Sequence, residues 1–167
     1  MNLEIQKAAP EDAPDLTLLA HAAKRHWGYP EKWIALWRDD LTLTPDFISD
    51  NEVFAARRGE ELIGFYALTI EDGKAELEHL WVSPDQIGQG AGRILFEHAM
   101  SRAASMNARV IEIVSDPNAE GFYLRMGARK VGEIVSEIEG SRRALPRLVF
   151  DVHRDEKCDG VDSWSLD

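Results

Sequence analysis

Alternating apolar and polar residues predict several strands in the first half of the chain. Three of them are expected at residues 3–8, 52–57 and 61–71, with a hairpin turn between the last two. Asp72-Gly73 is a strong signal for a second, two-residue hairpin turn. It leads into another predicted strand over residues 74–82, so this part of the sheet is expected to be antiparallel.

Apolar residues spaced three or four positions apart predict four helices. These begin near Pro14, near Trp33, at about residue 90 and near Pro117. Pro14 suits the first turn of a helix, where the N–H that proline lacks would have no partner. Gly127 is a stop signal for the last helix. Thr44-Pro45-Asp46 is interpreted as a break between two elements.

The later strands complete a mixed sheet. Residues 110–114 are almost wholly apolar, which predicts a short strand buried on both faces. Residues 129–138 and 145–152 are the last two predicted strands. Strand, helix and strand alternate after residue 74, so part of the sheet is expected to be parallel. We therefore expect an α/β (α+β) fold whose mixed, mostly antiparallel sheet has about seven strands and helices on both faces.

Length and composition fit one domain. The 167 residues suit a single domain at residues 1–153, followed by an acidic, flexible tail at 154–167. The formal net charge of -11 argues against duplex nucleic acid or an anionic membrane as partners, since both attract basic surfaces. No apolar run approaches the roughly 18 residues of a membrane helix. The single cysteine, Cys158, excludes an intrachain disulfide and fits a cytoplasmic location.

Three glycines alternate in the loop between the strand at 74–82 and the long helix. Gly88, Gly90 and Gly92 let the backbone approach a ligand closely, and the following helix points its free N–H groups at the loop. Together these features predict an anion site the size of a pyrophosphate, with Arg93 as an added donor. The spacing fits neither the dinucleotide fingerprint nor the Walker loop. A tightly packed helix entry is the structural alternative.

The residues around this loop occur in an order and spacing typical of one enzyme superfamily. They are Leu80-Trp81-Val82-Ser83-Pro84, the glycine loop, Ile94-Leu95 and the pattern Ala119-x-x-Phe122-Tyr123-x-x-x-Gly127. In this arrangement the chain resembles the GCN5-related N-acetyltransferase (GNAT) superfamily, whose members bind acetyl-coenzyme A. The resemblance covers the order of elements over residues 3–152 and is specific over residues 77–132.

The resemblance implies that the coenzyme lies in a V-shaped opening between the fourth and fifth strands, at 74–82 and 110–114. By this resemblance the pantetheine arm pairs with Leu80, Trp81 and Val82. The pyrophosphate is expected on the loop amides of Gly88, Gln89, Gly90, Ala91 and Gly92. Further coenzyme contacts are expected from Ile87, Arg93, Asn118, Phe122 and Tyr123.

Two positions depart from the usual pattern of the family. Ile87 stands where the family usually has Arg or Gln, a change that binding through backbone amides tolerates. Asp116 stands where the family commonly has an Asn near the pantetheine, and Asn118 follows two residues later. The sequence leaves open which of these two side chains makes the contact.

Acyl transfer to an amine requires a neutral amine, donors for the oxyanion and a proton for the departing thiolate. Tyr123 stands where the family has its general acid, with core packing of the Phe-Tyr pair as the alternative role. Glu78 is the candidate base and His79 is the alternative. Strand alternation predicts that only one of these two faces the site. A third possibility is that no base is essential, because proximity and orientation alone lower the barrier.

The acceptor region is expected between the first two helices. By the resemblance, His26-Trp27-Gly28-Tyr29 helps to build the acceptor pocket, and the alternative is that its aromatic side chains fasten these helices to the sheet. Arg142-Arg143 is expected in a turn before the last strand. Residues 1–86 hold 17 acidic and 8 basic side chains, whereas residues 87–150 hold 7 and 9. The acidity thus lies away from the phosphate loop, which favours a cationic or neutral acceptor.

The leading hypothesis is an N-acetyltransferase that moves an acetyl group directly from acetyl-coenzyme A, as co-substrate, to an amine of a small molecule or peptide in a ternary complex. No metal is expected, because the five histidines show no ligand spacing. A non-catalytic acyl-coenzyme A binding module and a nucleotide-binding regulator are the rival hypotheses. The sequence does not identify the acceptor, and it is compatible with a homodimer without requiring one.

Overall fold

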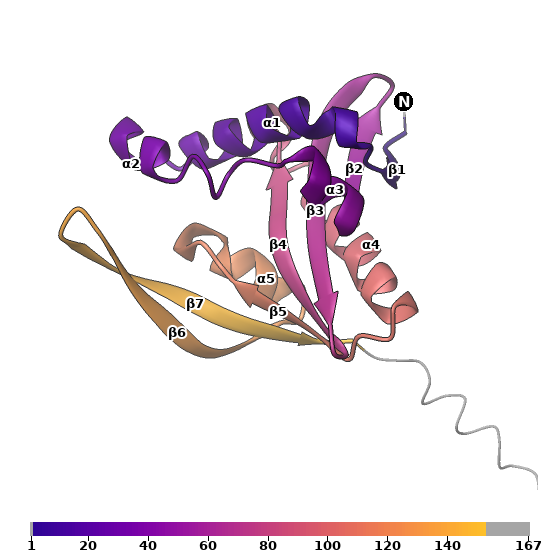
Figure 1. Ribbon diagram of the computed structural model, residues 1–167. Helices are drawn as coiled ribbons and strands as arrows, with labels where there is room; N and C mark the ends of the chain where they lie inside the picture. The colour runs from indigo at the N-terminus through magenta and orange to yellow at the C-terminus, as the bar shows by residue number, and fades with distance from the viewer. Residues whose placement is uncertain (1, 153–167) are drawn as a thin grey trace, which may run out of the picture.

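A computed structural model describes residues 2–152 of the chain (Figure 1). Within these residues seven strands form one sheet in the order β1-β2-β3-β4-β5-β7-β6. The strands are β1 (Glu4–Lys7), β2 (Glu52–Arg58), β3 (Glu61–Glu71), β4 (Lys74–Val82), β5 (Val110–Val114), β6 (Arg129–Ile138) and β7 (Ser141–Asp151). The β4–β5 pair is parallel, and the other pairs are antiparallel. The predicted mixed, mostly antiparallel sheet is confirmed.

Helices cover both faces of this sheet (Figure 1). They are α1 (Ala13–His26), α2 (Glu31–Leu36), α3 (Pro45–Asp50), α4 (Ala91–Ser105) and α5 (Glu120–Arg125), with 3-10 turns η1 (Pro10–Asp12), η2 (Pro84–Gln86) and η3 (Pro117–Ala119). No helix in the described part of the chain is long and apolar enough to cross a membrane.

Two apolar cores hold these layers together, one on each face of the sheet. The α1 core includes the buried side chains of Leu16 and Leu19, which pack over β2 and β3. The α4 core includes Leu95 and Phe96, both fully buried. Truncating a buried leucine such as Leu95 to alanine typically costs about 2–5 kcal/mol of stability. The apolar stripes of α1 and α4 therefore fix the sheet that carries the functional site.

The predicted break at Thr44-Pro45 is instead the start of helix α3. The Thr44 hydroxyl accepts a hydrogen bond from the backbone N–H of Phe47 at 3.1 Å, which caps this helix. Pro45 occupies the first helical position, where proline is well tolerated. The helix is only six residues long, so it is too short to produce a helical repeat in the sequence.

The sheet splits between β4 and β5. The two strands pair in register only from Lys74 opposite Val110 to Glu76 opposite Glu112. Beyond Glu76, β4 continues to Val82 while β5 turns away toward β7 (Figure 1). This separation creates the predicted V-shaped opening between two arms, β1–β4 and β5–β7–β6.

A β-bulge interrupts β4 at the point where the strands separate. Ala67 of β3 pairs with His79, and the next residue, Leu68, pairs with Leu77, so Glu78 is an extra residue in β4. A bulge of this kind bends the strand and places its two bulged residues on nearly the same side. Glu78 and His79 therefore do not alternate as residues of a regular strand would.

The bulge also exchanges the faces of β4. Before it, the side chains of Ala75 and Leu77 belong to the α4 core. After it, Leu80 and Val82 pack against that core, and Trp81 packs against the α1 core. Leu77 and Leu80, which a regular strand would place on opposite faces, therefore both face the α4 core and line the same side of the opening.

Two further expectations from the sequence need correction. β5 is buried at Ile111 and Ile113, but Val114 is 48% exposed because β4 has already turned away at this point. β7 begins at Ser141, so Arg142 and Arg143 lie in a strand and not in a turn. The predicted tail at 154–167 lies outside the described residues.

Candidate functional site

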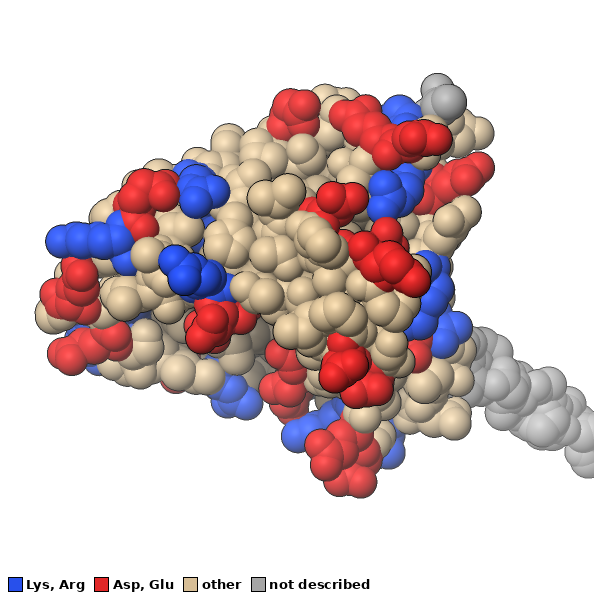
Figure 2. All heavy atoms as spheres, turned by 45° about the horizontal axis from the view of Figure 1, so that its top comes forward, with Lys and Arg blue, Asp and Glu red and all other residues tan. Residues whose placement is uncertain are grey.

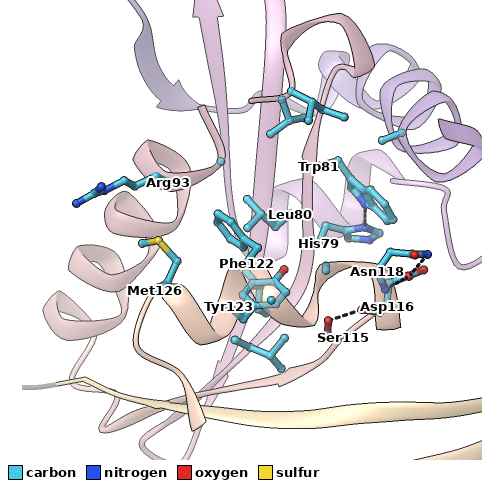
Figure 3. Close-up of a pocket in the computed structure, with 18 of the residues that line it drawn as sticks. His79, Leu80, Trp81, Arg93, Ser115, Asp116, Asn118, Phe122, Tyr123 and Met126 are labelled. Atoms are coloured by element: carbon cyan, nitrogen blue, oxygen red, sulfur yellow. Dashed lines mark hydrogen bonds between the residues drawn. The ribbon is translucent and has the colours of Figure 1, made fainter. Parts of the chain in front are cut away.

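A cavity of about 840 Å³ occupies the opening between the two arms (Figure 3). The second half of β4, the glycine loop, the end of β5 and helix α5 form its walls. The predicted site residues that line it are Glu78, Leu80, Trp81, Val82, Ile87, Gly88, Gly90, Gly92, Arg93, Asn118, Phe122 and Tyr123. Gln89 and Ala91, also predicted, are not among the lining residues: Gln89 is exposed, and Ala91 is buried at the start of α4.

The glycine loop has the backbone geometry of an anion site. Gly88 and Gly90 have φ values of 84° and 91°, and a Cβ added at either position would meet no atom within 4 Å. Gly90 caps the 15-residue helix α4, whose first N–H groups have no partner within the helix. The positive φ values and the open space beside them leave the backbone accessible to a ligand.

Gly92 has a different role from the other two glycines. A Cβ at this position would lie 3.4 Å from the Phe122 ring and 3.8 Å from a methyl group of Val82. Gly92 therefore permits close packing of α4 against α5 and β4. The tight packing considered for this loop is thus found at Gly92, whereas Gly88 and Gly90 leave the backbone open.

The second half of β4 presents a free backbone edge to the cavity. In the described structure its pairing with β5 ends at Glu76, so Leu80, Trp81 and Val82 have no strand partner on that side. All three line the cavity. An extended ligand with amide groups can pair with such an edge as an added strand would.

Tyr123 combines a buried ring with an accessible hydroxyl. Its side chain is 7% exposed and packs against Phe96 and Phe122, with ring centroids 5.8 and 5.1 Å away. The hydroxyl points into the cavity (Figure 3) and makes no hydrogen bond to the rest of the described chain. Burial, and then the charge of Asp116, raises the pKa of this hydroxyl above its ordinary value. The group keeps its proton at neutral pH and can donate it.

Glu78 lies at the bulge, where its carboxylate accepts a hydrogen bond from the Thr69 hydroxyl at 3.0 Å. Burial raises the pKa of this carboxyl, and the nearby Glu76 carboxylate raises it further. A base with a raised pKa is better matched to an amine proton at neutral pH. The prediction that only one of Glu78 and His79 faces the site is wrong, because both line the cavity.

His79 is held as a neutral ring with a fixed tautomer. Burial lowers its pKa to about 4. The Trp81 indole N–H donates to His79 Nδ1 at 3.0 Å (Figure 3). Because an indole can only donate, the ring proton of His79 must be on Nε2. His79 therefore offers a donor to its surroundings, which disfavours it as the base.

Asp116 and Asn118 differ in how far their side chains are already occupied. Asp116 bonds Lys24 Nζ at 2.7 Å and accepts the Tyr29 hydroxyl at 3.0 Å. Burial opposes its ionisation, but these bonds hold the pKa of the carboxyl below its ordinary value. Asn118 donates its amide N–H to Asp116 and Tyr29, and its carbonyl oxygen has no partner among the described residues. Asn118 thus retains a free acceptor group at the cavity.

The aromatic residues of the predicted acceptor region divide into two groups. Tyr29, Trp33 and Trp37 pack on one another, with ring centroids 5.1 to 6.0 Å apart, and so fasten α2. Trp27 lines the cavity and is 38% exposed. Arg143 reaches this aromatic group from β7, which sequence reasoning missed because it placed this arginine in a turn.

Comparison with protein families identifies this arrangement. The model of the acetyltransferase (GNAT) family matches residues 14–128, which span both the α1 core and the cavity. The chain belongs to the acetyltransferase (GNAT) family. The expectation of an N-acetyltransferase enzyme is therefore confirmed. Within residues 2–152, no group of three or more His, Cys, Asp or Glu side chains is arranged to hold a metal ion.

Two bacterial relatives of this GNAT chain carry a more specific name. The chain is 32% identical over 135 residues to the peptidyl-lysine N-acetyltransferase YjaB of Salmonella typhimurium, a match that covers 71% of this chain and 88% of the relative. It is 27% identical over 135 residues to the Escherichia coli protein of the same name, with 71% and 86% covered.

Solved structures share the GNAT fold. The PaiA N-acetyltransferase from Thermoplasma acidophilum, in complex with coenzyme A, has a TM-score of 0.69 and 24% identity, over 90% of this chain and 99% of that one. An aminoglycoside 6'-N-acetyltransferase complexed with coenzyme A also has a TM-score of 0.69, at 15% identity, over 93% and 99% of the two chains. These matches confirm the GNAT-like sheet with its split between β4 and β5.

Proposed function

We propose that the protein is an acetyl-coenzyme A dependent N-acetyltransferase that transfers the acetyl group directly to an amine in a ternary complex. The observation that carries this proposal is the shared cavity. The hydroxyl of Tyr123 and a carboxylate with a raised pKa, that of Glu78, line it together with the glycine loop. An acid, a base and an anion site thus open onto one space.

The residues present fit acetyl-coenzyme A as a substrate. Gly88 and Gly90 leave room beside the backbone for a pyrophosphate, and the N-terminus of α4 favours its negative charge. The free edge of β4 suits the amide groups of pantetheine, and the free carbonyl oxygen of Asn118 can accept one of their N–H groups. We therefore assign the pantetheine contact to Asn118 and not to Asp116, whose carboxylate is already bonded to Lys24 and Tyr29.

The chemistry follows from the two titratable groups. Glu78 takes a proton from the incoming ammonium, and the neutral amine then forms a bond from its nitrogen to the acyl carbon. When the bond from that carbon to sulfur breaks, the Tyr123 hydroxyl gives its proton to the departing thiolate. The nitrogen of the new amide then loses its second proton, which returns to the Tyr123 oxygen. General acid and base groups of this kind contribute about 10²–10⁴-fold to a rate.

Direct transfer is favoured because the described lining of the cavity includes no thiol and, apart from Tyr123, no free hydroxyl. Apart from Tyr123, the lining hydroxyl is that of Ser115, whose side chain is 3% exposed. The Ser115 hydroxyl donates to the backbone carbonyl of Asp116 at 2.6 Å. A covalent acyl intermediate on Ser115 would require this bond to break.

A lysine side chain of a protein is the acceptor that we propose to test first. The two named relatives are peptidyl-lysine N-acetyltransferases, and a lysine ammonium agrees with the cationic or neutral acceptor expected from the charge distribution. Acidic side chains are spread over the face shown in Figure 2 and are interspersed with basic ones. This face therefore presents no single charged patch that would attract a lysine side chain.

The decisive experiment is an acceptor screen that monitors thiol release from acetyl-coenzyme A. Peptides with a single lysine, small diamines and free amino acids are compared at saturating coenzyme. We expect turnover with at least one amine and loss of that turnover in Glu78→Gln. Tight coenzyme binding in calorimetry without thiol release from any amine would instead indicate a non-catalytic acyl-coenzyme A binding module.

A further inference from the structure

A compact group of charged and aromatic side chains lies behind the cavity wall that Asp116 and Asn118 form. We call Lys24, Tyr29, Asp116 and Arg143 the Asp116 cluster. Lys24 Nζ lies 2.7 Å from Asp116 Oδ2, and the Tyr29 hydroxyl lies 3.0 Å from each oxygen of that carboxylate. Arg143 Nη2 donates to the Tyr29 hydroxyl at 3.0 Å. The charged side chains are only 9 to 12% exposed.

The four residues come from elements on both arms of the split sheet. Lys24 lies in α1 and Tyr29 in the segment that joins α1 to α2. Asp116 lies between β5 and η3, and Arg143 lies in β7. The contacts between them join positions 87 to 114 residues apart in the sequence. In Figure 1, α2 and the β6–β7 hairpin extend on the same side of the molecule. The bond from Arg143 to the Tyr29 hydroxyl joins β7 to the segment that precedes α2.

Aromatic rings enclose the two cations of the cluster. Lys24 Nζ lies 4.4 Å from the centre of the Trp37 ring and 5.0 Å from that of Tyr29. The Arg143 guanidinium lies 5.1 and 5.3 Å from the same two rings. Cation–π contacts gain strength when water is excluded, which helps to offset the cost of burying the charges. The cluster therefore has one well-defined arrangement.

The cluster supports the cavity at the end away from the glycine loop. Asp116 and Asn118 line the cavity, whereas Lys24, Tyr29 and Arg143 do not. Figure 3 shows Asp116 and Asn118 on the opposite side of Tyr123 from Arg93. If coenzyme phosphates occupy the Arg93 end, the acceptor must approach from the Asp116 end.

We propose that the Asp116 cluster is a clamp that holds the α1–α2 segment against β7 and thereby sets the affinity for the acceptor amine. Lys24, Tyr29 and Arg143 are its positioning residues, which act through Asp116 and Asn118 without touching either substrate. The effect on acceptor affinity rests on the proposed function. The claim that the cluster holds the α1–α2 segment against β7 rests on the contacts alone.

The test compares Tyr29→Phe, Lys24→Met and Arg143→Gln with the wild type. Tyr29→Phe keeps the ring that contacts both cations but loses the hydroxyl that bonds Asp116, Asn118 and Arg143. We expect the KM for the acceptor to rise by roughly 10–100-fold, because displacing a positioned group by about 1 Å can have an effect of this size. Asn118, which we assign to pantetheine, keeps its two bonds to Asp116 in Tyr29→Phe, so the dissociation constant of acetyl-coenzyme A should change less than the KM for the acceptor, and kcat should change little.

Lys32→Gln is the matched control. Lys32 forms an ion pair with Glu139 at 3.0 Å, which also joins α2 to the β6–β7 hairpin, but its side chain is 69% exposed. Exposed pairs of this kind contribute little, so this variant should keep the wild-type KM. Lys24→Arg retains a cation at position 24 and should restore part of the acceptor affinity lost in Lys24→Met.

Hydrogen exchange over residues 27–44 separates this proposal from the proposed function. The clamp is supported if exchange is faster than in the wild type in the three cluster variants and unchanged in Lys32→Gln. Unchanged exchange overturns it, and an equal loss of acceptor and coenzyme affinity overturns the assignment to the acceptor. If the wild type acetylates no amine, the proposed function fails, and exchange still decides whether the cluster holds the α1–α2 segment.

Discussion

At the glycine-loop end of the cavity, the groups that face a ligand belong to the main chain, whereas at the Asp116 end they are held by side chains. Gly88 and Gly90 leave backbone N–H groups open beside helix α4. At the other end, Asp116 is fixed by Lys24 and Tyr29 from a different arm of the sheet. The first end can keep its shape through many side-chain changes, and the second depends on a few residues.

This difference suits the two ligands of an acetyltransferase. A coenzyme is constant, so a backbone site that binds it tolerates changes in sequence around it. An acceptor varies between enzymes, and a site held by side chains can be altered one residue at a time. Four predictions test this contrast, beginning with the variant for which we expect the greatest change.

Tyr123→Phe should have the largest effect, a fall in kcat of about 10²–10⁴-fold, because the variant loses the proton for the departing thiolate. The ring packing against Phe96 and Phe122 remains. Steady-state kinetics measure kcat, and calorimetry with acetyl-coenzyme A measures the affinity for the coenzyme separately. Full activity in this variant would remove the general acid from the mechanism.

Asp116→Asn should lower the free energy of unfolding by about 3–5 kcal/mol, because it leaves the buried Lys24 ammonium without its partner. The double variant Lys24→Met with Asp116→Asn removes both charges and should recover much of this loss. Urea unfolding of the single and double variants gives the coupling between the two residues. Equal stability of wild type and Asp116→Asn would show that the Asp116 end does not depend on the ion pair between Lys24 and Asp116.

Lowering the pH should destabilise the fold through His79. Its pKa is about 4 in the folded state, below the ordinary value of 6.5, so the unfolded state binds a proton first. The stability from the neutral ring is complete above pH 6.5 and is lost as the pH falls toward 4, by about 3 kcal/mol. His21 and His98, whose pKa values are also lowered, act in the same direction.

His79→Gln isolates the share of this pH dependence that belongs to His79. The variant should show a flatter decline in unfolding free energy between pH 6.5 and 4 than the wild type. Thermal unfolding at several pH values provides the comparison. An identical decline in both proteins would assign the effect to the other histidines and to acidic groups.

Gly90→Ala should have the smallest effect, a loss of about 1–2 kcal/mol in acetyl-coenzyme A binding. The added methyl group meets no protein atom, but it fills the space beside the backbone that we assign to the pyrophosphate, and the positive φ of 91° strains the loop geometry that leaves its N–H groups open. Gly88 has a similar φ and should behave alike. Calorimetry with acetyl-coenzyme A measures the affinity of each variant.

Gly92→Ala is the control for the loop glycines. Its φ does not lie in the left-handed region, so its effect depends on whether the Phe122 ring, 3.4 Å from the added Cβ, can shift. We expect a smaller loss of coenzyme affinity than in Gly90→Ala. If Gly92→Ala weakened binding more, the loop would act mainly through helix packing.

The backbone-built features were the ones that sequence reasoning predicted well. Asp72-Gly73 specifies its turn through local chemistry, and both residues have positive φ in the structure. The hairpin therefore sets β3 and β4 within a residue of their predicted bounds. The alternating glycines likewise identify the loop before α4, because the constraint acts on neighbouring residues.

The side-chain features could not be predicted in the same way. The Asp116 cluster joins positions up to 114 residues apart, and no local pattern relates Lys24 to Arg143. The extra residue at Glu78 leaves no mark in the sequence, because both Glu78 and His79 are polar types that suit either face. Its effect appears only when the pairing with β3 is known.

That extra residue gives β4 one more side chain than its pairing with β3 requires. Deleting Glu78 would leave Leu77 opposite Leu68 and His79 opposite Ala67, so the pairing would become regular while Leu80 and Val82 still faced the α4 core and Trp81 the α1 core. The deletion would therefore remove a carboxylate from the cavity without exchanging cavity wall and core. By contrast, pairing all nine residues of β4 without a bulge would turn Trp81 toward the α4 core and Leu80 toward the α1 core. The bulge thus adds a polar side chain to the cavity while both cores keep their residues.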